Sequence, residues 1–133
     1  MNIEITLAQS VAQAIGKLYG AEVDTEKIQL QKTRKEFEGD FTLVVFPFLA
    51  LSKKRPEETA QEIGEELKNS LPIISSFNVV KGFLNLAIAP SYWVELLKHI
   101  DAAEKWGTTP VTENSPLVMV EYSSPNTNKP LHL

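Results

Sequence analysis

Two pairs of strand-like segments, alternating with helical segments, most constrain how this chain can fold. Residues 28–33 alternate apolar and polar side chains, and residues 41–46 are rich in β-branched and aromatic residues. A second pair spans 73–80 and 83–89, with Lys81-Gly82 between its members. Helical segments precede, separate and follow the two pairs. The order α-β-β-α-β-β-α predicts an α+β fold, a two-layer sandwich with an antiparallel-type sheet.

The first two helices carry clear end signals. Thr6 and Gln9 fit a capping box at the start of the first helix, although residues 1–5 could extend that helix backwards, and Gly20 is its expected stop. Pro56 suits the first position of the second helix. The buried face of that second helix is predicted to be Ala60, Ile63, Gly64 and Leu67. Close packing on the sheet would explain the glycine.

A third amphipathic helix is predicted from about Ser91 to Trp106-Gly107. Its expected apolar side is Trp93, Leu96, Leu97 and Ile100. Residues 108–116 contain two prolines and read as a linker. We therefore predict three parts: a domain over 1–107, a linker over 108–116, and the start of another domain over 117–133.

The apolar run at 117–120 predicts a buried strand of a parallel sheet. A polar, proline-containing loop follows it, and open α/β sheets bind ligands at such carboxyl ends of strands. Polar residues crowd ten positions of this loop, among them Ser123, Ser124, Asn126, Asn128, Lys129 and His132. They suit phosphate and small polar substrates. The alternative is a flexible tail.

Composition sets limits on function. The chain has 133 residues, a net charge of −4 and no cysteine, which excludes disulfides and cysteine metal sites and favours a cytoplasmic location. No apolar run approaches a membrane span. The acidic balance argues mildly against general nucleic-acid binding, yet Lys and Arg residues gather in 32–55. Such a cluster is more often a solvated surface than a binding patch.

Residues 83–88 form the most informative strand. If Leu84 and Leu86 face the core, the two-residue period puts Phe83 and Asn85 together on the other, exposed face. A ring can stack on a base while an amide reads a base edge. The alternative is that Phe83 packs under the third helix and Asn85 serves a turn. Gly39-Asp40 reads as a turn.

Four sequence motifs resemble those of arginyl-tRNA synthetases. Glu121-Tyr-Ser-Ser-Pro-Asn126 and Lys129-Pro-Leu-His-Leu133 are similar to the opening of that family's catalytic domain, with His132-Leu133 as the first half of the class I His-Ile-Gly-His motif. Glu38-Gly-Asp-Phe41 and Lys81-Gly-Phe-Leu-Asn85 are similar to marks of its N-terminal additional domain. The resemblance covers essentially the whole chain.

The resemblance implies a role for each matching residue. Positions matching Glu121, Ser124 and Asn126 hold the substrate L-arginine. The position matching His132 contacts ATP, with which Mg²⁺ is expected, and the position matching Lys129 supplements or replaces a lysine of the second class I signature. Phe83 and Asn85 match the pair that contacts the D-loop of tRNA(Arg), whereas Val80 stands where some members carry a third contact, an Asn.

The resemblance implies a parent arginine–tRNA ligase that is monomeric and needs no membrane. It uses ATP to activate arginine, then esterifies the arginine to tRNA(Arg). This chain would contain the tRNA-binding domain and the first strand of a truncated Rossmann-type domain, and is expected to be inactive alone. The alternatives are a standalone RNA-binding module and a protein-interaction α+β module.

Overall fold

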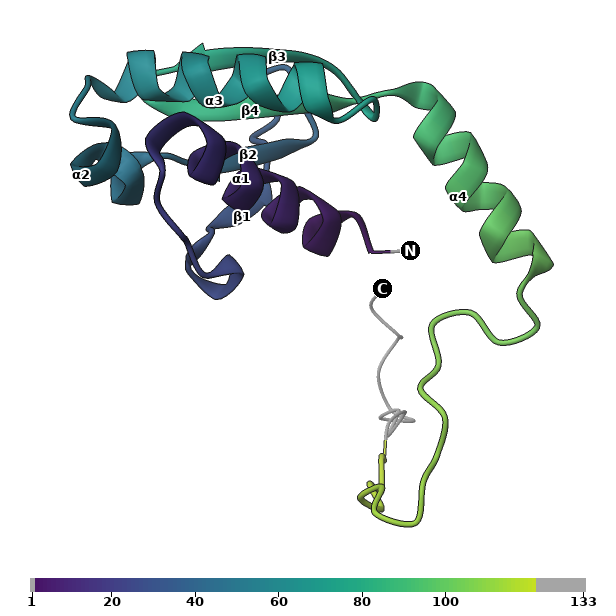
Figure 1. Cartoon of the computed structure of the whole chain (residues 1–133). Coiled ribbons are helices and arrows are strands. Elements are labelled where there is room, and N and C mark those ends of the chain that lie inside the picture. Colours follow the sequence, from purple (N-terminus) through teal and green to yellow (C-terminus); the bar gives the residue numbers. More distant parts are fainter. Residues whose placement is uncertain (1, 122–133) are drawn as a thin grey trace, which may run out of the picture. The chain divides into compact units, whose positions relative to one another are not determined.

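The computed structural model describes residues 2–121 and divides into two compact units, Met1–Ala103 and Glu104–Leu133. The first unit contains all the helices and strands of the described residues (Figure 1). They are α1 (Ile3–Tyr19), β1 (Leu30–Lys32), β2 (Phe41–Val44), α2 (Leu49–Ser52), α3 (Pro56–Ser70), β3 (Ile74–Val80), β4 (Phe83–Ile88) and α4 (Pro90–Ala102). Two 3₁₀ turns lie at Thr25–Lys27 and Phe46–Phe48. The predicted α+β order is confirmed, with the short helix α2 added.

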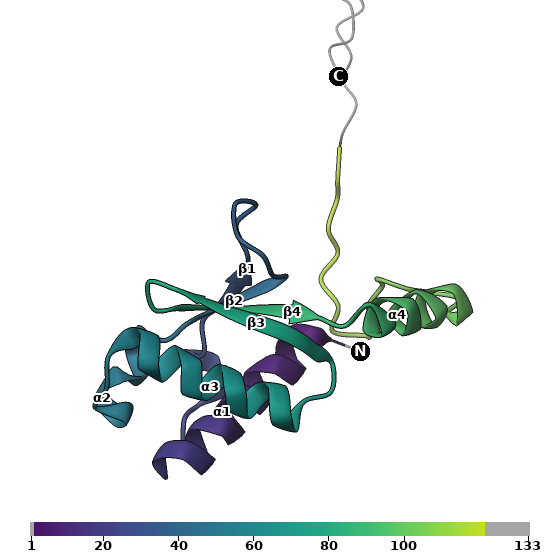
Figure 2. The ribbon, with the colours of Figure 1, turned by 90° about the horizontal axis from the view of Figure 1, so that it is seen from above.

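The four strands form one antiparallel sheet in the order β1-β2-β4-β3. Helices α1 and α3 lie on one side of this sheet, and the β1–β2 connection rises on the other (Figure 2). Apolar side chains fill the space between the helices and the sheet. The largest fully buried ones are Leu7, Ile15, Leu43, Ile63, Leu67, Leu84 and Leu86. The predicted inward facing of Leu84 and Leu86 is confirmed.

Helix α1 begins earlier than its predicted capping box. The side-chain oxygen of Asn2 accepts hydrogen bonds from the backbone N–H groups of Glu4 (3.0 Å) and Ile5 (3.4 Å). This is an N-cap. The predicted role of Thr6 is wrong, because its hydroxyl lies inside the helix and donates to the backbone oxygen of Asn2. Gly20 ends the helix at φ 65°, as predicted.

Helix α3 approaches the sheet closely at Gly64. A Cβ built there would lie 2.6 Å from two ring carbons of Phe77 in β3 and 2.9 Å from a methyl carbon of Leu84 in β4. All four residues predicted for the buried face of α3 are buried. The predicted reason for the glycine is confirmed: a side chain at this position would occupy space that the sheet already fills.

Helix α4 differs from its prediction in its end and in its buried side. It ends at Ala102 rather than at Trp106-Gly107. Tyr92 is its buried residue, and Leu96 packs partly against the core, whereas Trp93 is 39% and Leu97 is 65% exposed. The predicted apolar side is therefore only partly covered by the described residues.

The strand predicted at 117–120 is not seen. These four residues are exposed, at 98%, 70%, 93% and 69%, and form no ladder with the described strands. A parallel strand needs neighbouring strands for its backbone hydrogen bonds. Among residues 2–121, no strand pairs with this run. In the same residues, no helix is long and apolar enough to cross a membrane.

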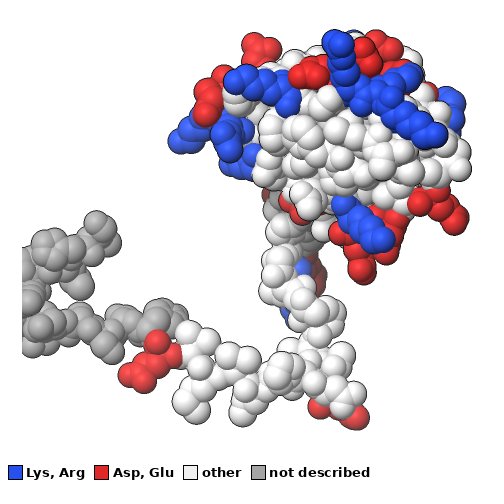
Figure 3. All heavy atoms as spheres, turned by 90° about the vertical axis from the view of Figure 1, so that its left-hand side faces the viewer, with Lys and Arg blue, Asp and Glu red and all other residues white. Residues whose placement is uncertain are grey.

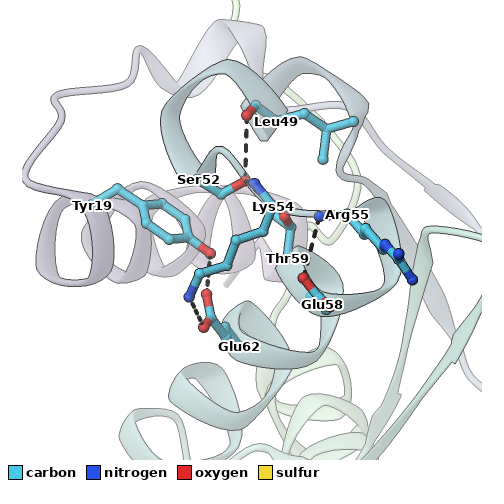
Figure 4. A network of polar contacts seen from close by, with 8 residues as sticks. All are labelled: Tyr19, Leu49, Ser52, Lys54, Arg55, Glu58, Thr59 and Glu62. Carbon is cyan, nitrogen blue, oxygen red and sulfur yellow. Dashed lines mark hydrogen bonds and ion pairs between the residues drawn. The ribbon is translucent and has the colours of Figure 1, made fainter.

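A polar contact network ties α1 to the start of α3 (Figure 4). The Tyr19 hydroxyl donates to a carboxylate oxygen of Glu62 at 2.9 Å, and Lys54 forms an ion pair with the other oxygen. The hydrogen bond from Lys54 lowers the pKa of the Glu62 carboxyl, against a smaller opposing effect of burial. Burial, followed by the bond to Glu62, raises the pKa of Tyr19.

We predict that Gly64→Ala destabilises the chain and that Gly16→Ala does not. Alanine favours a helix by up to about 1 kcal/mol over glycine, but overpacking at residue 64 costs about 1–3 kcal/mol. At Gly16 in α1 the nearest atom to an added Cβ is 3.7 Å away. Urea unfolding of both variants separates the two effects. Equal stabilisation by both alanines would contradict the close approach of α3.

The Glu62 carboxylate predicts a pH-dependent contribution to stability. Its pKa is lower in the folded state, so it stabilises the fold above its unfolded pKa of roughly 4.3, and the contribution is lost as pH falls through the folded value. Glu62→Gln should therefore lower the free energy of unfolding at pH 7, by at most about 1 kcal/mol because the pair is partly exposed. The difference from the unsubstituted chain should shrink as pH falls below the unfolded pKa of roughly 4.3. A difference that stays constant between pH 7 and pH 3 would contradict this.

Candidate functional site

The strand register aligns polar side chains across the sheet face opposite α1 and α3. Gln31 pairs with Thr42, Thr42 pairs with Asn85, and Asn85 pairs with Asn78. The row therefore crosses all four strands. Directly beside it runs an apolar row in which Val44 and Val80 flank Phe83. One face of the sheet thus presents amides and hydroxyls next to an aromatic ring.

Hydrogen bonds fix the orientation of the Asn85 side chain. Its oxygen lies 2.6 Å from the Thr42 hydroxyl, and its nitrogen donates to the side-chain oxygen of Asn78 at 2.9 Å. The Asn78 nitrogen donates in turn to the backbone oxygen of Glu38 at 2.7 Å. Thr33 joins the other end of the row through Thr42. The Asn85 amide retains one N–H and one lone pair for a further partner.

The β1–β2 connection closes over part of this row. Gly39, at φ 132°, lies so close that an added Cβ would be 3.2 Å from the Cβ of Asn85. Asp40 holds the connection down, since its backbone N–H donates to Leu86 O (2.8 Å) and its carboxylate accepts from the Ile88 N–H (2.7 Å). The predicted turn at Gly39-Asp40 therefore also shapes the site.

Beside this connection lies a hollow of about 350 Å³. Thr42 and Asn85 are buried at its floor, Val80 and Phe83 are partly buried in its walls, and exposed side chains form its rim. The rim residues are Gln31, Arg34, Phe37 and Lys81. Pockets for small ligands begin at about 300 Å³, so the volume suits one base or a similar flat group. The lining contains two cations and no carboxylate.

The ring of Phe83 is held in place by its neighbour. Phe46 meets it edge to face, with ring centroids 5.5 Å apart and planes at 78°. This geometry is a favoured arrangement of aromatic pairs. The Phe83 ring therefore contacts Phe46 and also lines the hollow. A ring so fixed can offer a stacking surface without first being ordered.

The structure places Phe83 and Asn85 on one sheet face, as the two-residue period predicts, but corrects their exposure. Asn85 is only 2% exposed, because the β1–β2 connection and its hydrogen-bond partners cover it. Phe83 is partly buried rather than open. Phe83 packs edge to face against Phe46 rather than under the third helix as the alternative has it, whereas Asn85 lies close beneath Gly39 of the β1–β2 connection.

The other predicted site residues lie at or beyond the end of the described chain. Glu121 is exposed and belongs to no helix or strand. Ser124, Asn126, Lys129 and His132 lie outside the described residues. Within residues 2–121, no group of three or more His, Cys, Asp or Glu side chains is arranged to hold a metal ion.

Sequence reasoning missed several residues of the hollow. The strand register, once known, places Thr42 of the hollow opposite Asn85, and also Asn78, which orients Asn85 without lining the hollow. Phe37, Arg34 and Lys81 had no such signal, because they lie in connections whose path over the sheet is set by tertiary contacts. The sequence shows a cluster of basic residues at 32–55, which contains Arg34 but not Lys81, and it does not tell which of them face the hollow.

Known proteins resemble this chain in sequence and in fold. Residues 6–88 match the family model described as the arginyl tRNA synthetase N terminal domain. Arginine–tRNA ligases of Bacteroides thetaiotaomicron and Phocaeicola vulgatus are 61% and 63% identical to the whole chain. The chain spans 22% of the length of each. A solved Thermus thermophilus arginyl-tRNA synthetase superposes on 71% of the chain, which is 15% of that structure, with a TM-score of 0.60 and 21% identity.

The α+β domain with its polar hollow thus corresponds to a domain of an aminoacyl-tRNA ligase. The chain belongs to the arginyl-tRNA synthetase family and contains its N-terminal domain. The resemblance inferred from the four sequence motifs is confirmed.

Proposed function

We propose that the chain is the tRNA-contacting N-terminal part of an arginine–tRNA ligase. The ligase activates L-arginine with ATP and esterifies it to tRNA(Arg) in the cytoplasm. The observation that carries the proposal is the hollow on the open sheet face, in which a fixed aromatic ring, an oriented amide and two cations converge. These are the groups that recognise an unstacked base of an RNA loop.

The base would stack on Phe83 and contact the floor at Asn85. Because the amide of Asn85 is already fixed by Thr42 and Asn78, its remaining N–H and lone pair need no reordering when a ligand arrives. Val80 replaces the Asn found in some family members and contributes an apolar wall instead. We therefore assign the D-loop contact to Phe83 and Asn85, with Val80 as packing.

The residues after the domain receive their proposed roles from the family motif. Glu121, Ser124 and Asn126 hold the arginine substrate. His132 contacts ATP and stabilises the charge that develops on its phosphates, with Mg²⁺ bound to the nucleotide, and Lys129 supplements or replaces a catalytic lysine of the second class I signature. These residues would form one edge of a nucleotide pocket in a Rossmann-type catalytic domain. The 133-residue chain alone is expected to be inactive in arginine activation.

One observation favours a protein-binding role as the second candidate. Trp93, Val94 and Leu97 on α4 are 39%, 53% and 65% exposed, which leaves an apolar strip on that helix. Exposed apolar patches often mark protein contacts. Tight binding of a protein partner, with no protection of tRNA(Arg) from nucleases by the chain, would favour this function over RNA binding.

We predict that Phe83→Leu weakens tRNA(Arg) binding by about 1–3 kcal/mol, because leucine keeps an apolar contact with Phe46 but cannot stack on a base. Phe83→Tyr should bind nearly as well as the unsubstituted ligase. The measurements are the dissociation constant and the KM for tRNA(Arg).

The matched control is Leu51→Ala, which removes an exposed apolar side chain that does not line the hollow. It should leave the affinity unchanged. Equal affinities for the leucine and tyrosine variants would discard stacking by Phe83.

We also predict that His132→Ala slows arginine activation while tRNA(Arg) binding by the domain persists. The imidazole would no longer stabilise charge on the ATP phosphates. Arginine-dependent exchange of pyrophosphate into ATP measures the step, and direct tRNA binding is the control. Unchanged exchange would refute the role of His132.

A further inference from the structure

The hollow has a cation at each end. Arg34 follows Lys32, which pairs with Phe41 at the start of β2. Lys81 precedes Phe83, which pairs with Val44 at the end of β2. Because β2 spans four residues, at about 3.3 Å per residue, the two cations reach the hollow from points on the order of 10 Å apart along the strand direction.

Both cations are available to an external anion. They are exposed, and neither forms an ion pair with a carboxylate among residues 2–121, in contrast to Lys17, Lys54 and Lys98. The eight lining residues of the hollow include no Asp or Glu, although the whole chain carries a net charge of −4. The rim of the hollow is therefore positively charged, although the net charge of the whole chain is negative.

Lys81 is held at the rim by an unusual backbone. Lys81 and Gly82 form the two-residue β3–β4 turn, with φ angles of 48° and 78°. Turns of this kind strongly favour Asn, Asp or Gly at the first position, so a lysine there costs conformational energy. Gly82 is buried, and an added Cβ would lie 2.5 Å from the Cβ of Pro56. The turn is thus packed rigidly on the start of α3.

Figure 3 shows the end of the molecule that carries α2 and the β3–β4 turn. Lys and Arg side chains, interspersed with acidic ones, lie around a central uncharged area. The hollow itself is lined by uncharged residues, two cations and no carboxylate. Such a lining suits a ligand whose middle is flat and apolar and whose ends are anionic. A nucleotide within an RNA strand has this distribution, with the base between two phosphates.

We infer that Arg34 and Lys81 bind the two backbone phosphates that flank the base held in the hollow. This inference rests on the proposed function and adds the two residues that grip the RNA strand itself. Arg34 offers a planar fork for phosphate oxygens, and Lys81 offers a point charge. The site would therefore take a nucleotide of an extended, unpaired RNA strand. The backbone of that strand would run from one end of β2 to the other.

The test is the salt dependence of tRNA(Arg) binding by the chain. Each lost phosphate contact reduces the slope of log K against log salt concentration by about 0.7–0.9. We expect Arg34→Gln and Lys81→Gln each to show this reduction, and the double variant to show both. Arg34→Lys and Lys81→Arg keep the charge and should restore the slope. Thermal unfolding should be unchanged, because both side chains are exposed.

Lys68→Gln is the matched control, since Lys68 is exposed on α3, forms no ion pair among the described residues and does not line the hollow. Its slope should equal that of the unsubstituted chain. Slopes for Arg34→Gln and Lys81→Gln that match this control would overturn the inference.

Two further outcomes separate this inference from the proposed function. If Phe83→Leu weakens binding but both glutamine variants keep the slope, the inference fails and the proposed function stands. If Phe83→Leu and the glutamine variants all bind like the unsubstituted chain, or if tRNA(Arg) is not bound, both fail. Displacement of the RNA by poly-glutamate at equal charge concentration would overturn both in favour of an acidic protein partner.

Discussion

Strand β4 contributes side chains to both faces of the sheet. Because these side chains alternate, the residues that it buries in the core determine which residues line the hollow. Leu84 and Leu86 are fully buried under α3, so Phe83 and Asn85 must emerge on the opposite side. The close approach of α3 at Gly64 fixes how β4 lies against the helices. A shift of β4 by one residue would put Asn85 into the apolar core and two leucines into the hollow. The register that stabilises the fold is thus the register that builds the site.

The sequence predicted the parts of this arrangement that depend on local patterns. The buried face of α3, the reason for Gly64 and the shared face of Phe83 and Asn85 follow from periods of 3.6 and 2.0 residues. The burial of Asn85 could not be predicted from these periods, because it is caused by the β1–β2 connection, which folds over Asn85. That connection is held by Asp40, which bonds to backbone atoms of β4 more than forty residues further along the chain. No local pattern reports such a contact.

The errors at the end of the domain have a related cause. An apolar helix side or strand is predicted as buried because apolar surface avoids water. Burial also requires a surface to pack against, and Leu97 of α4 and the run at 117–120 are left exposed. The relatives are several times longer than this chain, which spans 22% of their length. The apolar patterns therefore indicate which residues favour burial, but they do not indicate which surface covers those residues.

The buried polar row holds the floor of the hollow in one arrangement. An unpaired amide at the floor would be costly and free to turn, whereas Asn85 is bonded on both sides by neighbours in the same row. The bonds remove the choice between its two flipped orientations, so its donor and acceptor point in fixed directions. The strained turn at Lys81 and the edge contact of Phe46 fix the wall in the same way. Side chains that are already ordered in the folded chain lose little conformational entropy when a ligand binds, so more of the interaction energy contributes to affinity.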